Sequence, residues 1–394
     1  MNTTPIQMGE QAIAAQRPRA ALAFDPLIVL AALGLVACSL VTLKGAGGVA
    51  YSHRQALYAG IGVVVMIAVA AFDYSLLRRF WYVLYGIAVA LNLVVLALPE
   101  QPGTGARRWI PLPLFQLQPS EVGKVLLILT LAAVAVDRSR RQSELRTIVR
   151  VLLLALLPAL LVVAQPDLGT GLVYLTVAVA VLFFAGIGWK QLTALAVLAV
   201  IGVVMALAVA PALGVNVLKT YQKQRLTTFV DPPAVCHTQT DQTCYQLQQS
   251  LIAIGSGEKT GRGVGGATQT KFRFVPEAQD DFIFAVVGET YGFVGAALVL
   301  ALYALLIWRT LRIVTIAKNL FGTLVAGGIL AMFMFQVFLN VGMTIGIMPV
   351  TGVPLPLLSY GGSSVLVTFL ALGLLESIHI QARMSSASKP RALI

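Results

Sequence analysis

The sequence predicts an all-α integral membrane protein with ten transmembrane helices. Of its 394 residues 58% are hydrophobic and only 11% are charged, whereas a soluble domain carries about a quarter charged residues. The apolar runs have lengths near the roughly 20 residues that cross about 30 Å of hydrocarbon as a helix. Arginine and lysine collect in alternate connections between these runs, as the positive-inside rule requires of a multi-pass protein.

The ten expected spans follow from the apolar runs in chain order. They cover residues 27–43, 56–72, 81–98, 119–136, 151–164, 168–188, 191–212, 282–307, 320–345 and 361–380. The fifth span is short, and Gln165, Pro166 and Asp167 separate it from the sixth.

The basic residues orient these spans. An even number of crossings puts both termini on one side, and most arginines and lysines of the connections fall on that side, which is therefore cytoplasmic. Residues 1–26 and 381–394 are then cytoplasmic tails of a transmembrane domain at 27–380, and a large loop at about 213–281, between the seventh and eighth spans, is extracytoplasmic. Orientation accounts for most of the net charge of +12, so we expect membrane lipids and no nucleic acid as partners.

The polar segment at 211–281 is the expected place of the chemistry, because a membrane protein has no structural need for so polar an excursion. It ends with Asp280 and Asp281 directly before the apolar run that begins at Phe282. Either aspartate could cap that helix, and two adjacent carboxylates could also divide a capping and a catalytic task. Their spacing leaves this choice open.

Two charged residues lie inside the fourth span. Glu121 and Lys124 are three positions apart, which places them on one helix face. Each charge alone costs about 2.5 to 3.5 kcal/mol at the centre of a bilayer, so both must face protein or a water-filled cavity. They either neutralise each other and lock helices together, or Lys124 directs its charge into an anion-binding site.

Arg107 and Arg108 occupy an outer connection, against the positive-inside bias. They serve either lipid headgroups or a phosphate-bearing substrate gripped by the forked guanidinium groups. Asp167 follows Pro166 immediately before the sixth span, where an aspartate is also a good helix cap. Its role as a cap or as a functional residue stays open here.

Cysteine and glycine mark two further features of the polar loop. Cys236 and Cys244 both lie in it, where an oxidising compartment permits a disulfide and where free thiols are the alternative. The glycine-rich stretch at 255–266 lacks the Gly-Lys-Ser/Thr ending of a phosphate-binding loop. We interpret it as a flexible loop or as re-entrant backbone that lines a cavity.

Several longer motifs resemble one family. They are Gln-Pro-Asp-Leu-Gly-Thr at 165–170, Gln-Ser-Leu-Ile-Ala-Ile-Gly-Ser-Gly at 249–257, Thr-Gln-Thr at 268–270, Phe-Val-Pro-Glu-Ala-Gln-Asp-Asp-Phe-Ile-Phe-Ala-Val at 274–286 and Gly-Val-Pro-Leu-Pro-Leu-Leu-Ser-Tyr-Gly-Gly-Ser-Ser at 352–364. In this order they resemble the SEDS family over nearly the whole chain. The segment at 342–356 is more similar to the elongation members of the family than to its division members.

The resemblance implies a ten-helix protein of the bacterial cytoplasmic membrane. It implies a peptidoglycan glycosyltransferase that polymerises lipid II at the outer face of that membrane during cell elongation and releases undecaprenyl diphosphate. Asp281 corresponds to the essential acid and is the expected general base, whereas Asp280 stands where a neutral residue such as Thr is usual. A second negative charge next door should raise the pKa of one of the two. The expected substrate-binding residues are Arg107, Arg108, Gln118, Glu121, Lys124, Gln165, Asp167, Thr170, Lys271, Glu277 and Ser359.

The resemblance also implies a partner, a class B penicillin-binding protein that supplies the crosslinking transpeptidase. A divalent cation such as Mg²⁺ could share the stabilisation of the leaving diphosphate with one carboxylate; the sequence shows no dedicated metal cage, and we expect no organic cofactor. Two other functions stay open. The same charges could serve a lipid II flippase, or the chain could be a non-catalytic scaffold of a cell-wall synthesis complex.

Overall fold

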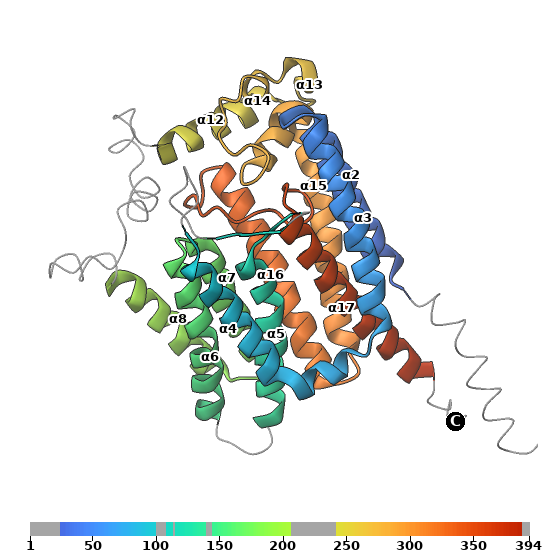
Figure 1. Ribbon diagram of the computed structural model, residues 1–394, viewed down its shortest axis with the longest axis vertical. Helices are drawn as coiled ribbons and strands as arrows, with labels where there is room; N and C mark the ends of the chain where they lie inside the picture. Colours follow the sequence, from blue (N-terminus) through green and yellow to red (C-terminus); the bar gives the residue numbers. More distant parts are fainter. Residues whose placement is uncertain (1–23, 100–107, 113–114, 139–143, 206–241, 388–394) are drawn as a thin grey trace, which may run out of the picture.

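The computed structural model describes residues 24–99, 108–112, 115–138, 144–205 and 242–387, and these residues are almost entirely helical (Figure 1). The helices are α2 (Pro26–Ala46), α3 (Val49–Ala71), the 3-10 helix η1 (Tyr74–Phe80), α4 (Trp81–Ala97), α5 (Pro119–Arg138), α6 (Glu144–Ala164), α7 (Leu168–Phe184), α8 (Trp189–Val204), α12 (Gln242–Ser256), α13 (Gly263–Gly266), α14 (Thr268–Lys271), α15 (Ile283–Ile316), α16 (Leu320–Thr344) and α17 (Gly362–Ala387). A short antiparallel hairpin of β1 (Ile110–Pro111) and β2 (Gln116–Leu117) precedes α5.

The helices confirm a multi-spanning membrane protein. Each expected span coincides with a helix, and within the described residues eight helices are long and apolar enough to cross a membrane. α7 and the apolar part of α8 are shorter, so the number of ten crossings stays a prediction. The prediction of a short fifth span beginning at residue 151 was wrong, because α6 has 21 residues and begins at Glu144. The first turns of α6 contain charged residues and are still helical, because long charged side chains at the end of a span can reach water.

Short polar side chains cap the start of several of these helices. Asp25 accepts a hydrogen bond from the backbone N–H of Leu27 at 3.1 Å at the start of α2, and Asn319 accepts one from Gly322 at 2.8 Å at the start of α16. These bonds satisfy N–H groups that have no partner inside the helix.

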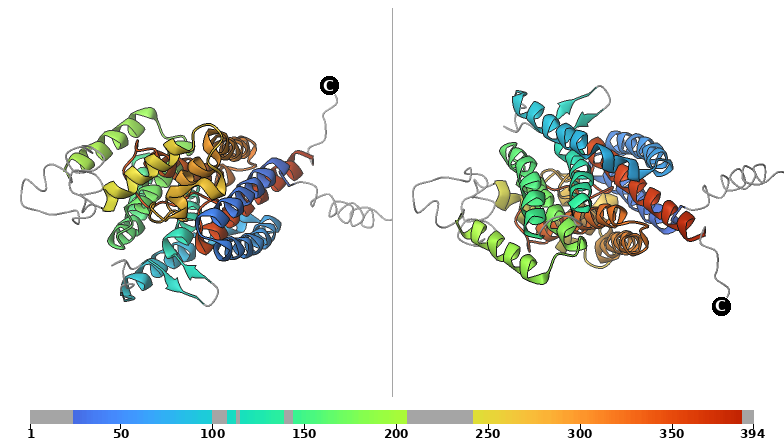
Figure 2. Two further views of the ribbon diagram at one scale, coloured as in Figure 1. Left: turned by 90° about the horizontal axis from the view of Figure 1, so that it is seen from above. Right: turned by 90° about the horizontal axis from the view of Figure 1, so that it is seen from below.

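The centre of the bundle consists of α5, α16 and α17. In their most apolar stretches 83%, 67% and 89% of the residues are buried, compared with 17% in the stretch that contains η1 and α4. α3 packs along α17, α2 along α15, α4 along α5 and α6 along α7, as the views along the bundle show (Figure 2). The outer helices expose apolar side chains, which is the arrangement expected toward lipid.

Small residues bring α3 and α17 close together. A Cβ atom on Gly62 would lie 2.2 Å from the Phe369 ring, and one on Gly373 would lie 2.7 Å from the carbonyl oxygen of Met66. Only glycine fits at these two crossings, as is common where membrane helices pack closely.

α15 is broken at Gly292, and the glycine-rich turn fills the break. Gly292 has a φ of 63° and a ψ of −159°, which are not helical values. The backbone N–H groups of Phe293 and Val294 donate to the carbonyl oxygens of Glu258 and Lys259 at 2.9 and 3.1 Å. The carbonyl groups of residues 258 and 259 are therefore held at this break, which favours ordered backbone over a flexible loop for this part of the glycine-rich stretch, whereas Gly263 and Gly265 are exposed.

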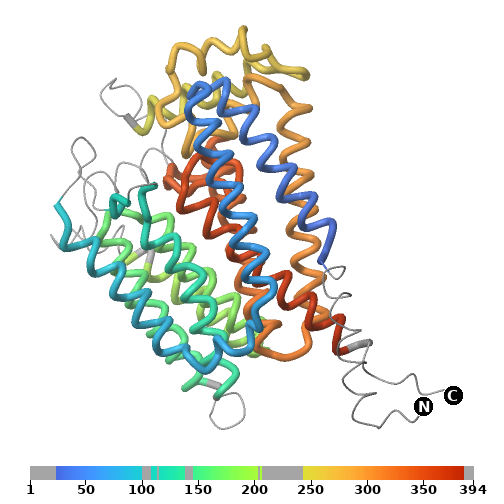
Figure 3. Tube along the Cα trace, turned by 45° about the vertical axis from the view of Figure 1, so that its right-hand side comes forward, coloured from blue at the N-terminus to red at the C-terminus, as the bar shows by residue number. Residues whose placement is uncertain are grey.

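The two ends of the bundle differ. α12, α13 and α14 lie together at one end, and α2 begins and α17 ends at the other (Figure 3). At that second end Arg309 of α15 forms an ion pair with Asp25, with 2.8 Å between its Nε and Oδ2, and the backbone N–H of Asp25 donates to Glu376 at 2.9 Å. These contacts tie α2, α15 and α17 to one another.

Candidate active site

Asp281 lies on a tight turn directly before α15. Glu277, whose φ is 52°, accepts hydrogen bonds at its carbonyl oxygen from the backbone N–H groups of Asp280, Asp281 and Phe282 at 3.1 to 3.2 Å. The Nδ2 of Asn340 on α16 donates to the carbonyl oxygen of Asp281 at 2.8 Å. The backbone of Asp281 is thus fixed on both sides, and the residue is half-buried.

Neither aspartate occupies the capping position of α15. Its N-cap residue is Phe282, and no side chain caps the helix there. The expectation that Asp280 or Asp281 is the N-cap residue of this helix is therefore wrong.

Asp280 carries a proton at neutral pH. Burial raises the pKa of its carboxyl group to about 8, and the charges of Asp281 and Glu277 and a hydrogen bond with Glu277 act in the same direction. Its Oδ1 is enclosed and has no hydrogen-bond partner in the described structure. Burial is the main cause of the raised pKa and the charge of Asp281 adds to it, so Asp280 is the one of the two aspartates that holds the proton.

Glu289 anchors the segment that leads to this turn. Its fully buried carboxylate accepts hydrogen bonds from the backbone N–H groups of Gln269 and Thr270 at 2.8 and 2.9 Å and from the Thr270 hydroxyl at 2.6 Å. These donors belong to the start of α14, where a negative charge is favourable. Glu289 was not among the predicted site residues, although a carboxylate in an apolar span is a signal of function.

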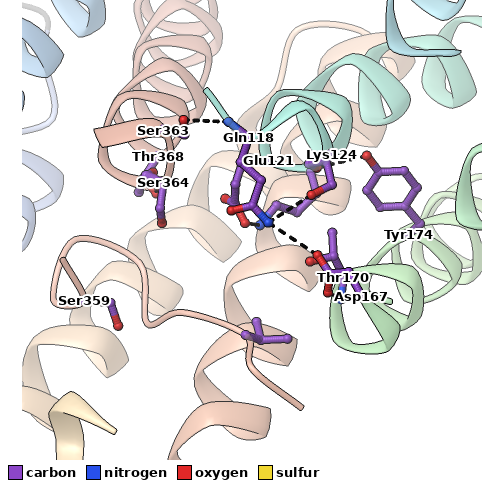
Figure 4. A network of polar contacts seen from close by, with 12 residues as sticks. Gln118, Glu121, Lys124, Asp167, Thr170, Tyr174, Ser359, Ser363, Ser364 and Thr368 are labelled. Carbon is purple, nitrogen blue, oxygen red and sulfur yellow. Dashed lines mark hydrogen bonds and ion pairs between the residues drawn. The ribbon is translucent and has the colours of Figure 1, made fainter. Parts of the chain in front are cut away.

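A second group of polar residues lies where α5, α7 and α17 meet (Figure 4). Glu121 and Lys124 form a salt bridge of 2.7 Å on α5, with side chains that are 2% and 1% exposed. Gln118 donates from Nε2 to Ser120 at 3.1 Å and to Asp167 at 3.4 Å, and its backbone N–H donates to the Ser363 hydroxyl at 2.9 Å. The structure thus brings four of the expected residues into one buried network.

Asp167 belongs to both the helix and the network. Its Oδ1 accepts the backbone N–H of Thr170 at 3.1 Å and caps α7, while its Oδ2 faces Gln118. The Tyr174 hydroxyl donates to the carbonyl oxygen of Ser120 at 2.9 Å and ties α7 to α5. The cap at Asp167 is confirmed.

Arg108 and Gln165 hold the turn between α6 and α7. The Arg108 guanidinium donates to the carbonyl oxygens of Gln165, at 3.2 Å, and of Pro166. The Gln165 side chain donates to the carbonyl oxygen and to the side-chain oxygen of Asn92, both at 3.0 Å. Arg107 lies outside the described residues.

The remaining predicted residues lie apart from this network. Ser359 is fully buried, its hydroxyl accepts the backbone N–H of Leu355 at 2.9 Å, and Figure 4 shows it away from the cluster. Lys271 and Glu277 are exposed at the α14 end of the bundle. Cys244 is buried and disulfide-bonded; its expected partner, Cys236, lies outside the described residues, so that pairing stays a prediction.

One short segment connects Asp281 with the buried network. Asn340 donates to the carbonyl oxygens of both Asp281 and Val353, the latter at 2.7 Å. Val353 in turn packs against the start of α7, where a Cβ on Gly169 would lie 2.3 Å from its Cγ2. The arrangement offers a half-exposed carboxylate on a rigid turn, a neutral carboxyl beside it and a buried cation that the same scaffold holds.

These residues do not form a protein cage for a metal ion. Within the part of the chain that the structure describes, no group of three or more His, Cys, Asp or Glu residues could hold one. A divalent cation at this site therefore stays a prediction.

Comparison with known proteins places the whole architecture in one family. The family model described as "Cell cycle protein", which covers FtsW, RodA and SpoVE, matches residues 20–384. The chain belongs to the SEDS family. The peptidoglycan glycosyltransferase MrdB of Escherichia coli K12 is 36% identical to this SEDS protein over 366 residues, which cover 92% of this chain and 95% of MrdB. A probable peptidoglycan glycosyltransferase FtsW of Alkalilimnicola ehrlichii is 40% identical over 385 residues, which cover 93% and 90%.

Solved structures agree with this assignment. A chain from the structure titled "Structural coordination of polymerization and crosslinking by a peptidoglycan synthase complex" superposes on this SEDS protein with a TM-score of 0.77 and 31% identity, over 92% of this chain and 99% of that one. The crystal structure of RodA from Thermus thermophilus gives a TM-score of 0.65 and 29% identity, over 91% and 97%.

Proposed function

We propose that this SEDS protein is a peptidoglycan glycosyltransferase that polymerises lipid II at the outer face of the bacterial cytoplasmic membrane during cell elongation. The observation that carries the proposal is the half-buried Asp281 on its rigid turn, in a chain whose full-length relatives are named peptidoglycan glycosyltransferases. A carboxylate at a membrane boundary is suited to remove a proton from a sugar hydroxyl.

In the proposed topology the chain crosses the membrane ten times. The loop at about 213–281 is extracytoplasmic, and the tails at 1–26 and 381–394 are cytoplasmic. Support comes from the position of α12, α13 and α14 at the end of the bundle opposite to the start of α2 and the end of α17 (Figure 3). Asp281 then faces the side on which the glycan strand grows.

In the proposed reaction, a hydroxyl of the lipid-linked acceptor attacks the anomeric carbon of the lipid-linked donor. The new glycosidic C–O bond forms while the bond between that carbon and the diphosphate oxygen breaks, and the hydroxyl proton passes to Asp281. The diphosphate leaves without being protonated, so one base suffices, unlike the two carboxyl groups of a glycoside hydrolase. Direct displacement inverts the anomeric centre and gives a β-linked glycan from an α-linked donor. The protonated Asp280 keeps a second full negative charge away from the attacking hydroxyl.

The leaving diphosphate needs positive charge, which we assign to Arg107, Arg108 and Lys124. Arg108 uses part of its guanidinium to hold the α6–α7 turn and has further N–H groups to donate. Lys124 is bonded to Glu121, so it reaches a phosphate by exchanging the carboxylate for it. Gln118, Asp167 and Thr170 form hydrogen bonds that join the start of α5 to the start of α7 near this pair.

The other predicted binding residues divide by exposure. Lys271 and Glu277 are exposed beside the Asp281 turn and contact the substrate directly in this proposal. Gln165 and Ser359 are buried and act by fixing the loops on which the site is built.

A class B penicillin-binding protein is the proposed partner, with its transpeptidase crosslinking the strand that this protein polymerises. Support comes from the similarity to a chain of a peptidoglycan synthase complex whose title names both polymerization and crosslinking.

The purified protein, given lipid II in detergent, tests the function directly. We expect glycan polymer from the wild type and none from a folded Asp281→Ala variant. Polymer formation by Asp281→Ala at the wild-type rate would refute the assignment of the base. Lipid II translocation in vesicles without any polymer would favour the flippase, and neither activity would favour the scaffold.

A further inference from the structure

A separate cavity lies beside the Asp281 turn. It has a volume of about 190 Å³ and lies between the α2–α3 connection and residues 270–279. Tyr51 lines one side, and Arg273, Glu277 and Gln279 line the other. The volume is below the roughly 300 to 1,000 Å³ of sites for drug-sized ligands, so the cavity suits a single ring.

The charges in this cavity favour a neutral polar ligand. Arg273 contributes one positive charge and Glu277 one negative charge, while the neighbouring Asp280 is protonated. Among the residues that the structure describes, no salt bridge involves Arg273 or Glu277. A diphosphate or an acidic peptide would meet no excess of positive charge here, whereas a ligand that carries both donors and acceptors would be matched.

The aromatic side of the cavity has a fixed orientation. The Tyr51 ring packs edge-on against Tyr360, with 4.8 Å between ring centroids. The backbone N–H of Tyr360 donates to the carbonyl oxygen of Gln279 at 3.0 Å, which joins the two walls. An aromatic ring beside hydrogen-bonding groups matches a sugar ring, which has an apolar C–H face and polar edges.

The opposite wall is strained in a way that points to function. Arg273 and Glu277 both have positive φ values, 56° and 52°, although neither is glycine. Such backbone conformations persist where the surroundings enforce them, often at ligand sites. Glu277 also accepts the N–H of Asp281 at its carbonyl oxygen, so the cavity wall and the catalytic turn are one piece.

We propose that this cavity binds one N-acetylated sugar ring of the lipid-linked substrate, with the ring face on Tyr51 and its amide and hydroxyl groups on Arg273 and Glu277. The inference rests on the proposed glycosyltransferase function and names the part of the substrate that is recognised outside the reacting bond. It makes Tyr51 and Arg273 specificity residues for the sugar rather than for the lipid diphosphate.

The test compares two lipids that differ in the sugar. Binding of lipid II and of undecaprenyl diphosphate, which has no sugar, is measured in the Asp281→Asn background, so that no turnover occurs. We expect Tyr51→Ala and Arg273→Ala each to weaken lipid II binding about tenfold, which corresponds to about 1.4 kcal/mol, and to leave undecaprenyl diphosphate binding unchanged. Tyr51→Phe keeps the ring and should retain lipid II binding.

Matched controls come from the same end of the molecule. Tyr245→Ala and Lys259→Ala remove an exposed tyrosine and an exposed lysine outside the cavity and should change neither affinity. Equal weakening of both lipids by the cavity variants, or no weakening of either, would overturn the proposal. Because binding is read without turnover, failure of the wild type to polymerise would remove the proposed function while the comparison of the two lipids could still be interpreted.

Discussion

Variants of the buried salt bridge of α5 should show separate effects on stability and on activity. The ammonium of Lys124 and the carboxylate of Glu121 are 2.7 Å apart and almost fully enclosed. Removing one partner leaves an unpaired buried charge, which costs about 3 to 5 kcal/mol. We therefore expect Glu121→Gln or Lys124→Met alone to shift the unfolding equilibrium by about 10²- to 10⁴-fold.

The double variant separates the two roles of this pair. Glu121→Gln combined with Lys124→Met removes both charges at nearly constant volume, and such neutral replacements are often as stable as the original pair. Unfolding in mixed micelles should show the double variant close to the wild type, whereas the polymerisation assay should show a large loss of rate, because the diphosphate loses one of its three proposed cations.

Two results would refute this reasoning. Single variants as stable as the wild type would mean that the pair is solvated rather than buried. A double variant that polymerises lipid II at the wild-type rate would mean that Lys124 only locks α5 in place and has no role at the substrate.

Three further variants test other parts of the structure. The pKa of Asp280 is raised from 3.8 to about 8, so its contribution to stability is present below about pH 4 and is lost as the pH rises through 8. The melting temperature of the wild type should therefore fall between pH 4 and pH 8, and it should fall less in Asp280→Asn. The same fall in both proteins would contradict the raised pKa. Gly292→Ala would place a Cβ 2.3 Å from the backbone nitrogen of Gly261 and should lower the melting temperature strongly, while Gly86→Ala, where nothing lies within 4 Å, should not; equal effects would contradict the packed turn. Glu289→Gln replaces an acceptor of three hydrogen bonds and should speed hydrogen exchange at the start of α14; unchanged exchange there would show that Glu289 does not hold it.

Local signals predicted the spans and the pairing within α5. Among the described residues, hydropathy found the eight helices that are long and apolar enough to cross a membrane, together with α7 and α8, because the bilayer imposes length and composition on each span separately. The spacing of Glu121 and Lys124 predicted their common face, and proline before Asp167 predicted a helix start, since both depend on neighbours in the chain. The start of α6 was missed because its first turn is charged.

Contacts between distant segments were not predictable from one sequence. Glu289 binds the start of α14, and Asn340 binds the backbone of Asp281 from another helix. The break at Gly292 interrupts an apolar run of normal appearance, and its partner lies in the glycine-rich turn. The family motif suggested Ser359 as a binding residue, yet its hydroxyl oxygen accepts a hydrogen bond from the backbone N–H of Leu355. Each of these depends on tertiary packing that a single sequence does not record.

The rate of glycan polymerisation by Asp281→Asn tests the central claim most directly. Asparagine keeps the shape of the side chain and the bonds of its backbone but cannot accept the hydroxyl proton. We predict a loss of about 10²- to 10⁴-fold in rate, with lipid II binding retained and with Glu258→Gln, an exposed acidic residue at the same end, unchanged. Polymerisation by Asp281→Asn at the rate of that control would contradict a general base at Asp281.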